Sequence, residues 1–233
     1  MIFSSGELNV NIIYSLYNKY YYDTFLKDNK LEQKKEIKMK PNIEVVIPYY
    51  EGNLGKAYNQ AMKKVDDWAL MLDNDILILT PNWYPMLQEA ISYLGHSAGW
   101  ITCKTNSIWC DDQLDMSAPQ SGNIIDHMLY AKSIAKDGDP QIAEPSPYPY
   151  KFLGNIFSGF FILTHKEAWK DAGGFIEDNA EVSHFGHNFR CNKHLGVDND
   201  FFFRIKKAGY TTHVITNMYA FHLRELKYFA GTK

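Results

Sequence analysis

The sequence WALMLDNDILIL, residues 68–79, places two carboxylates, Asp73 and Asp75, between two apolar runs. An apolar run of this length beside a charged cluster predicts a strand that is buried on both faces. The carboxylates would then lie at the carboxyl edge of a sheet, where open α/β sheets bind their ligands. Alternate carboxylates at such an edge suit Mg²⁺ or Mn²⁺. The alternative is a solvated turn, because Asp and Asn are also ordinary turn formers.

The composition is that of a globular protein. The chain has 233 residues, 45% of them hydrophobic, which is enough to bury a substantial core. A net charge of −3 predicts no general polyanion-binding surface. We find no signal-peptide pattern and no apolar stretch near the ~20 residues of a membrane span. The 3 cysteines do not suit a disulfide framework, so we expect a soluble, cytoplasmic protein.

Strands and helices are predicted to alternate along the first half of the chain. Runs rich in β-forming residues predict strands at 10–17, 43–47 and 68–72. Apolar residues at helical spacing predict helices at 19–31 and 56–65. This order is typical of a doubly wound, mostly parallel sheet with helices on its faces.

The second half continues this pattern less regularly. Helices are predicted at 81–94, 124–135 and 165–172, and strands at 99–103, 155–164, 212–215 and 219–222. Between them, residues 104–150 are rich in proline and turn-forming residues. Loops of this length inside a compact enzyme are usually binding loops.

A second acidic cluster, Gly196-Val197-Asp198-Asn199-Asp200, precedes a helical pattern in which Phe201, Phe202 and Ile205 form an apolar face. Asp198 is placed where an N-cap would stand, and Gly209 is the expected end of the helix. Packing of the apolar face would hold the helix in place. Its first carboxylates would therefore be presented rigidly towards the edge of the sheet.

An ordered set of short motifs runs through most of the chain. It consists of the polar loop 15–18, Gly52-Asn53-Leu54-Gly55-Lys56-Ala57-Tyr58-Asn59, Asp73-Asn74-Asp75, Phe157-Ser158-Gly159-Phe160-Phe161, Gly173-Gly174-Phe175, the cluster 196–200 with Arg204 and Gly209, and His222. No single motif is specific. The ordered set resembles the GT-A-fold glycosyltransferases, most closely the inverting family 2 enzymes that use nucleotide sugars. The chain departs from that family at Val197, where the family has an acidic residue.

The resemblance implies a single GT-A domain over residues 1–233, with a mostly parallel, Rossmann-like sheet. About 1–103 would bind the nucleotide and about 104–233 the acceptor. The implied reaction moves a sugar from a nucleotide sugar, with a UDP-sugar as the favoured donor, to an acceptor hydroxyl with inversion. The implied cofactor is Mn²⁺ or Mg²⁺. The acceptor stays open among a glycan, a lipid-linked sugar, a protein side chain and a modified nucleobase.

The resemblance also implies roles for individual residues. The implied metal ligands are Asp75, Asp73 and His222. For Asp73 the alternative is a contact with the ribose. Donor contacts are implied for Ser15, Tyr17, Asn53, Lys56, Asp73, Asn74 and Gly159. Asp198 would be the base that removes the proton of the acceptor hydroxyl, with Asp200 as the reserve candidate.

Three of these positions carry a structural alternative. Gly159 would let the backbone approach the donor, or would mark a β-bulge. His222 would complete the metal shell, or would be a surface histidine near the end of the chain. Trp109 and the neighbouring Asp111 would line the acceptor side; the alternative for Trp109 is an ordinary core residue.

Residues His184, His187, Cys191 and His194 form a separate cluster in a stretch longer than the family usually has. Their spacing would allow a tetrahedral Zn²⁺ site but matches no standard zinc signature. The alternatives are an acceptor-binding insertion and a plain loop. For the whole chain, two other functions stay open: a nucleotidyltransferase, and a module that binds a nucleotide sugar without turnover.

Overall fold

The computed structural model describes residues 40–135, 138–145, 156–184, 186–193 and 195–223. The strand predicted at 10–17 and the helix predicted at 19–31 lie outside these residues. No helix within the described part of the chain is both long and apolar enough to cross a membrane.

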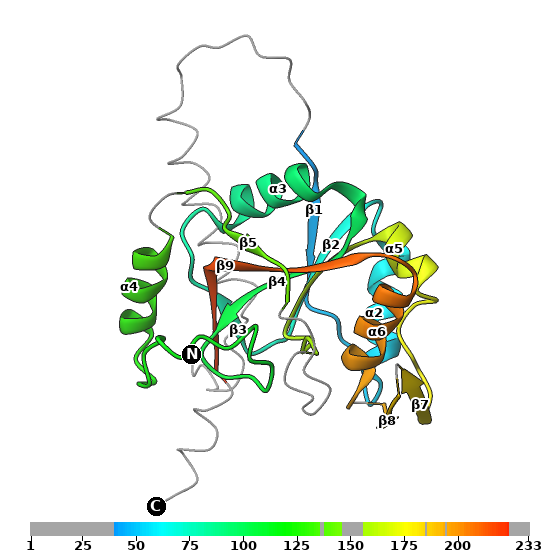
Figure 1. The fold of residues 1–233 in the computed structure, drawn as a ribbon. Coiled ribbons are helices and arrows are strands. Elements are labelled where there is room, and N and C mark those ends of the chain that lie inside the picture. The colour runs from blue at the N-terminus through cyan, green and yellow to red at the C-terminus, as the bar shows by residue number, and fades with distance from the viewer. Residues whose placement is uncertain (1–39, 136–137, 146–155, 185, 194, 224–233) are drawn as a thin grey trace, which may run out of the picture. The chain divides into compact units, whose positions relative to one another are not determined.

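The described strands form a seven-stranded sheet and a separate hairpin (Figure 1). The strands of the sheet are β1 (Ile43–Val46), β2 (Trp68–Leu72), β3 (Ile76–Ile78), β4 (Ala98–Thr105), β5 (Ile142–Ala143), β6 (Phe161–His165) and β9 (Thr211–His222). The hairpin consists of β7 (Ala180–His184) and β8 (His187–Cys191). The helices are α2 (Leu54–Lys64), α3 (Trp83–Leu94), the 3₁₀ turn η1 (Gly95–Ser97), α4 (Ile124–Ile134), α5 (Lys166–Asp171) and α6 (Val197–Lys207).

The sheet is mixed, with strand order β1-β2-β6-β4-β9-β3 and with β5 also paired to β9. The pairs β1–β2 and β4–β9 are parallel. Strand β6 runs antiparallel between β2 and β4, and both β3 and β5 are antiparallel to β9. The predicted α/β class, with helices around one central sheet, is confirmed. The predicted sheet was mostly parallel; the observed sheet is mixed, because β6 runs antiparallel between β2 and β4 and because β3 and β5 run antiparallel to β9.

Strand β2 shows why the opening sequence has its pattern. All five of its residues are buried, as expected for a strand covered on both faces. The chain then turns at Asp73, whose carbonyl accepts a hydrogen bond from the Ile76 amide at 3.3 Å. The apolar residues after the turn form the short strand β3, which pairs with the far end of β9.

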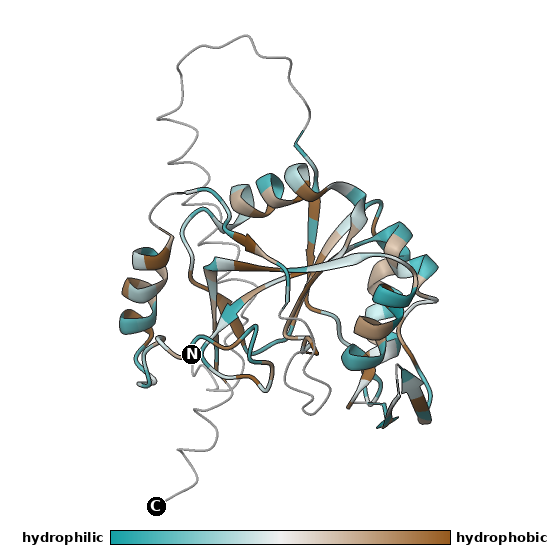
Figure 2. Ribbon diagram, viewed as in Figure 1, coloured by the Kyte–Doolittle hydropathy of each residue, from teal (hydrophilic) through white to brown (hydrophobic). Residues whose placement is uncertain are grey.

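The main core lies where α2, α5 and α6 pack together beside the sheet (Figure 1). Figure 2 shows apolar residues along the central strands and mixed polar and apolar faces on the helices. Phe201, Phe202 and Ile205 of α6 are buried, so the predicted apolar face is confirmed. The ring of Phe201 stacks on Phe175 with centroids 3.9 Å apart and also contacts Trp100 of β4.

Two predicted boundaries were wrong for identifiable reasons. The strand predicted at 155–164 begins only at Phe161, because the backbone of Ser158 is hydrogen-bonded to a side chain and not to a neighbouring strand. Helix α6 begins at Val197, with Gly196 at the N-cap position and a φ of +78°. Asp198 therefore lies in the first helical turn and is not the N-cap.

The two strands predicted near the end of the chain are one strand, β9, with a register shift against β4 between Ile215 and Tyr219. All three cysteines, Cys103, Cys110 and Cys191, are buried and none forms a disulfide. Burial raises the pKa of Cys103 far above its usual range, that of Cys110 to about 12 and that of Cys191 to about 11.

Gln113 holds the irregular segment in front of β6. Its amide nitrogen donates to the Ser158 carbonyl at 3.0 Å and to the Thr102 hydroxyl at 2.9 Å, and its oxygen accepts the Ser158 amide at 2.8 Å. The Gln113 side chain is fully buried. It therefore takes the place of a strand partner for the segment that carries Gly159.

Replacing Gln113 with leucine should lower the free energy of unfolding by about 2–4 kcal/mol, because several buried polar groups would lose their partners. Urea unfolding followed by circular dichroism measures this change. Gln120→Leu is the matched control, since Gln120 is exposed and its amide donates to the nearby Ala118 carbonyl. Equal losses in the two variants would contradict the role of Gln113.

Candidate functional site

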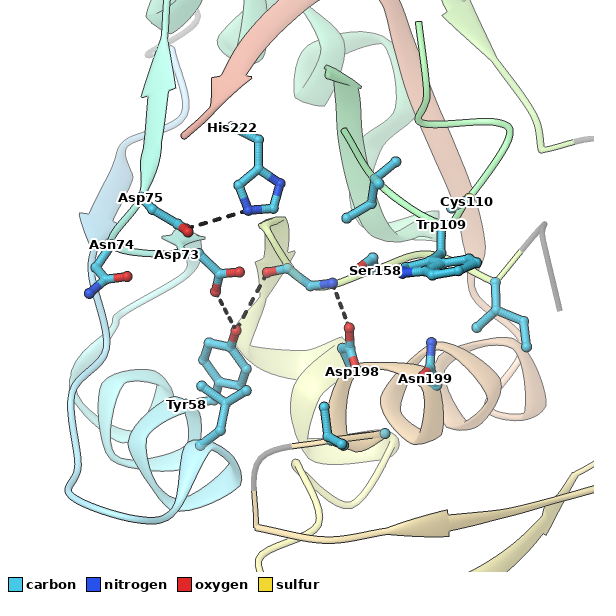
Figure 3. Close-up of a pocket in the computed structure, with 16 residues that line it drawn as sticks. Tyr58, Asp73, Asn74, Asp75, Trp109, Cys110, Ser158, Asp198, Asn199 and His222 are labelled. Atoms are coloured by element: carbon cyan, nitrogen blue, oxygen red, sulfur yellow. Dashed lines mark hydrogen bonds and ion pairs between the residues drawn. The ribbon is translucent and has the colours of Figure 1, made fainter. Parts of the chain in front are cut away.

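A cavity of about 850 Å³ opens beside the turn between β2 and β3 (Figure 3). This volume lies in the range of small-molecule sites. Its walls come from that turn, the loop after β4, the segment before β6, the start of α6 and the end of β9. The lining residues include Tyr58, Asp73, Asn74, Asp75, Ile108, Trp109, Cys110, Ser158, Gly159, Leu195, Asp198, Asn199 and His222. Both predicted halves of the chain contribute to it.

Asp73, Asp75 and His222 meet on one side of this cavity. One possible ligand atom from each lies within 4.8 Å of the other two. The pairing of Ile76 with His222 between β3 and β9 brings the histidine beside the turn, and its Nε2 lies 3.5 Å from Asp75 Oδ1. Two carboxylates and an imidazole are a ligand set that suits Mn²⁺ or Zn²⁺.

The ring of His222 is fixed in an orientation suited to a ligand. Its Nδ1 lies 2.9 Å from the carbonyl of Ser107, so Nδ1 carries the proton and donates it. The backbone amide of His222 donates to Asn106 Oδ1 at 2.8 Å, and the ring stacks against Phe160. In the neutral ring, Nε2 is therefore unprotonated and faces Asp75. A carbonyl that fixes the tautomer in this way is typical of metal-binding histidines.

Asp73 lies in a strongly negative environment. Burial, with repulsion from Asp75 and Asp198, raises the pKa of Asp73 to about 6. The Tyr58 hydroxyl, 3.3 Å from Asp73 Oδ1, is its hydrogen-bond donor. A divalent cation would offset this concentration of charge, so the residues present fit a metal ion.

Asp198 faces the same cavity from the first turn of α6 (Figure 3). Its Oδ2 accepts a hydrogen bond from the Gly159 amide at 2.7 Å, and burial raises the pKa of its carboxyl. A Cβ on Gly159 would lie only 2.8 Å from the Cβ of Asp198. The absence of a side chain at Gly159 therefore allows Asp198 to approach the backbone closely. Gly159 lies before β6 and is not part of a β-bulge.

Tyr58 connects the two acidic groups. Its hydroxyl lies 3.3 Å from Asp73 Oδ1 and 3.4 Å from the Gly159 carbonyl, and the Gly159 amide in turn donates to Asp198. Tyr58 is fully buried in α2. This role was missed in the sequence analysis, because a tyrosine on the apolar face of a helix is usually an ordinary core residue.

The predicted donor residues have different outcomes. Asn74 lines both the main cavity and an adjoining one of about 220 Å³, which Tyr49 and Tyr50 also line. Lys56 lies beside this smaller cavity, with its Nζ 2.9 Å from the Tyr50 hydroxyl. Asn53 lines neither cavity. It caps α2 by accepting the Lys56 amide at 2.9 Å, and its Nδ2 donates to the Glu177 carbonyl. Ser15 and Tyr17 lie outside the described residues.

Asp200, the reserve candidate for the base, does not line the cavity. It is buried, and its carboxylate binds the guanidinium of Arg204 and lies 2.8 Å from Nε2 of His184. These contacts join α6 to the hairpin β7–β8. The role of Asp200 is therefore structural.

Of the two residues predicted to contact an acceptor, Trp109 is 88% exposed at the cavity, so the alternative that it is a core residue was wrong. Its neighbour Cys110 is buried and Ile108 packs against the core, which holds the indole outward. Asp111 is exposed and does not line the cavity.

The predicted zinc cluster falls mostly on the hairpin, so this stretch is not a plain loop. His184 bonds Asp200, and Cys191 Sγ donates to the Gly196 carbonyl at 3.2 Å. His187 lies in β8, and His194 is outside the described residues. Among the described residues, no group of three possible ligands includes His184 or Cys191. The zinc hypothesis gains no support from these contacts.

The sequence matches no model of a known protein family, and it matches no curated protein.

Replacing Asp73 with asparagine should stabilise the metal-free protein at pH 7.5 by about 1–2 kcal/mol, a value reduced from the full pKa shift because Asp73 is only partly buried. The folded pKa of about 6 is above that of an unfolded aspartate. The wild type therefore loses stability as the pH rises from about 4 to 6, and the variant does not.

Urea unfolding at pH 4 and pH 7.5 measures this difference. The two proteins should be nearly equal at pH 4 and should separate at pH 7.5. Asp111→Asn serves as the exposed control. A variant less stable than the wild type at pH 7.5 would show that burial of the Asp73 charge and its repulsion by Asp75 and Asp198 do not lower the stability of the folded protein.

Gly159→Ala should destabilise the protein by about 1–3 kcal/mol, because the added methyl group overlaps the side chain of Asp198. Removing the opposing Cβ with Asp198→Gly should recover part of that loss in the double variant, a coupling that a double-mutant cycle measures. Strict additivity of the two substitutions would mean that the methyl group is accommodated elsewhere.

Proposed function

We propose that this protein is a metal-dependent glycosyltransferase with a GT-A-like fold. It would move a sugar from a nucleotide sugar, first of all a UDP-sugar, to an acceptor hydroxyl with inversion. The observation that carries the proposal is the pairing of two different acidic groups on one cavity: Asp73 and Asp75 with His222 on one side, and Asp198 on the other.

The two groups suit the two halves of such a reaction. A nucleotide sugar leaves as a diphosphate, and a bound Mn²⁺ or Mg²⁺ would supply positive charge to offset it. Asp73, Asp75 and His222 would hold this ion. The smaller cavity beside Tyr50 and Lys56 adjoins Asp73 and Asn74, which makes it suitable for the nucleotide.

Asp198 is suited to the proton. Inversion requires a base that takes the proton of the acceptor hydroxyl as its oxygen attacks from the face opposite to the diphosphate. Burial raises the pKa of Asp198 in the direction of neutral pH, and a general base works best when its pKa is near the working pH. The Gly159 amide donates to Oδ2 at 2.7 Å, and hydrogen bonds from the Asn199 amide and the Ser158 side chain also orient the carboxylate. The exposed indole of Trp109 would contact the acceptor at the mouth of the cavity.

Two other functions use parts of the same site. A nucleotidyltransferase would need the metal and nucleotide groups but would have no need for Asp198 across the cavity. A binding module would take up UDP and Mn²⁺ without turnover. The behaviour of Asp198 variants therefore separates these functions.

The test is release of UDP from a panel of UDP-sugars with and without Mn²⁺, in the presence of mixed acceptors. Asp75→Asn should weaken Mn²⁺ binding and remove the metal-dependent turnover. Asp198→Asn should retain UDP binding but lose turnover by about 10²–10⁴-fold, the usual contribution of a general base. Asp111→Asn, outside the cavity, is the matched control.

The proposal fails if two results occur together. The first is that no UDP-sugar is turned over or protects the protein against thermal unfolding. The second is that Asp75→Asn leaves the affinities for Mn²⁺ and UDP unchanged. UDP and Mn²⁺ binding without turnover of any sugar would favour the binding module. Turnover that persists in Asp198→Asn would remove Asp198 from the mechanism.

A further inference from the structure

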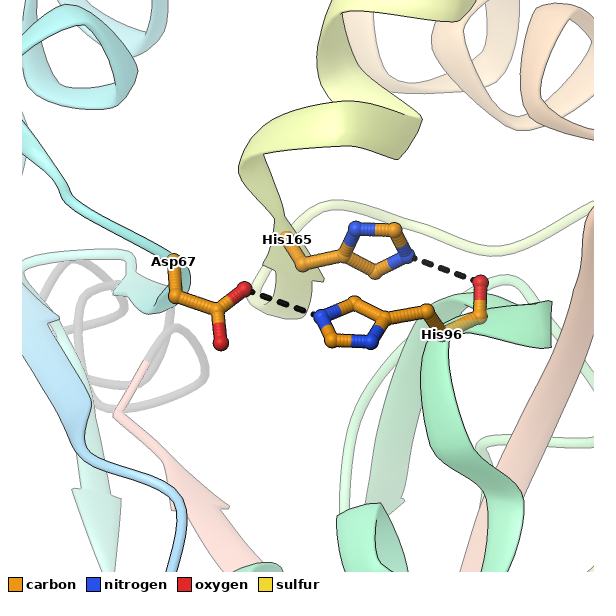
Figure 4. A group of neighbouring side chains, drawn as sticks. All are labelled: Asp67, His96 and His165. Carbon is orange, nitrogen blue, oxygen red and sulfur yellow. Dashed lines mark hydrogen bonds and ion pairs between the residues drawn. The ribbon is translucent and has the colours of Figure 1, made fainter.

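A second group of possible ligands lies at the opposite end of β2 from the cavity. Asp67 directly precedes β2, His96 lies in η1, and His165 is the last residue of β6. One possible ligand atom from each lies within 4.8 Å of the other two, and Figure 4 shows the three side chains gathered together. Since five residues of strand span about 17 Å, this group is well separated from Asp73 and Asp75.

His165 is held in one tautomer. Its Nε2 lies 3.1 Å from the carbonyl of His96, so Nε2 carries the proton and donates it. The ring is buried and packs against Trp68 and Tyr210. The other ring nitrogen, Nδ1, accepts a hydrogen bond of 3.3 Å from the Ala168 amide as the N-cap of α5, and this is the nitrogen that an ion would bind. A metal ion would take the place of that hydrogen bond.

This arrangement is similar to the one at His222. Each histidine is buried, and each donates one ring N–H to a backbone carbonyl. Such a carbonyl orients the ring and fixes the tautomer in metal sites.

Asp67 and His96 supply the open side of the group. His96 Nε2 lies 3.1 Å from Asp67 Oδ1, and both side chains are about half exposed. Water can therefore reach an ion bound between them and complete its shell. Two imidazoles and one carboxylate are typical ligands of Zn²⁺, with the remaining position open to water.

We propose that Asp67, His96 and His165 form a second divalent-metal site, for Zn²⁺ or a similar ion. The ion would join the start of β2, η1 and the end of β6 at the edge of the sheet away from the cavity. Its role would be to hold this edge together. The site is independent of the proposed function.

The test uses Co²⁺ as a visible probe on the full chain, produced without a histidine tag. Asp73→Asn and Asp75→Asn are introduced together so that the cavity cannot bind the ion. This variant should bind one Co²⁺ per chain with visible absorption bands, and Zn²⁺ should displace it. Adding His96→Gln or Asp67→Asn should weaken Co²⁺ binding at least about tenfold.

Asp66→Asn is the matched control, because Asp66 is the exposed neighbour of Asp67 and does not belong to the group. It should leave Co²⁺ binding unchanged. Zn²⁺ should also raise the melting temperature of the cavity variant, and this rise should disappear with His96→Gln. Since Asp67 and His96 are half exposed, their replacements should still fold.

The inference is overturned if the cavity variant binds no Co²⁺. It is also overturned if binding survives both His96→Gln and Asp67→Asn undiminished, since the ion would then lie elsewhere. A single ion that is bound by the wild type and lost with Asp75→Asn overturns this inference and leaves the proposed function standing.

Discussion

The antiparallel pairing of β3 with β9 is the constraint on which the candidate site depends. It brings His222, near the end of the described chain, beside the Asp73–Asp75 turn. The same strand β9 runs parallel to β4 and so ties this corner to the centre of the sheet. The loop after β4 then supplies the Ser107 carbonyl that orients the histidine. One strand thus aligns His222, the carbonyl that orients its ring and the Asp73–Asp75 turn.

The site concentrates charge that does not favour folding. Asp73, Asp75 and Asp198 repel one another, and burial raises the pKa of Asp73 and of Asp198. Such groups lower the stability of a protein and are usually kept because a ligand compensates for them. Hydrogen bonds hold these acidic side chains in place. Tyr58 donates to Asp73, the Gly159 amide donates to Asp198, and Gln113 holds the segment that carries Gly159.

The sequence predicted the parts of the molecule that follow from local pattern. Apolar spacing, which reflects burial, predicted three features: the buried strand before Asp73, the apolar face of α6 and the α/β class. The start of β6 was missed, because Gln113 replaces a strand partner and one side-chain amide leaves no periodic signal. His222 is oriented by the backbone carbonyl of Ser107, and Gly159 is packed against the Cβ of Asp198, which lies far from it in the sequence. Such contacts depend on tertiary structure and cannot be inferred from residue types.

The buried thiols give the chain a property separate from any ligand. A cysteine reacts as the thiolate, and Cys103, Cys110 and Cys191 are all shielded from solvent with raised pKa values. Alkylating reagents can reach them only when the surrounding structure opens. The three thiols lie in β4, in the cavity wall and in the hairpin strand β8. Their separate labelling rates would therefore report how often the sheet, the cavity and the hairpin each open.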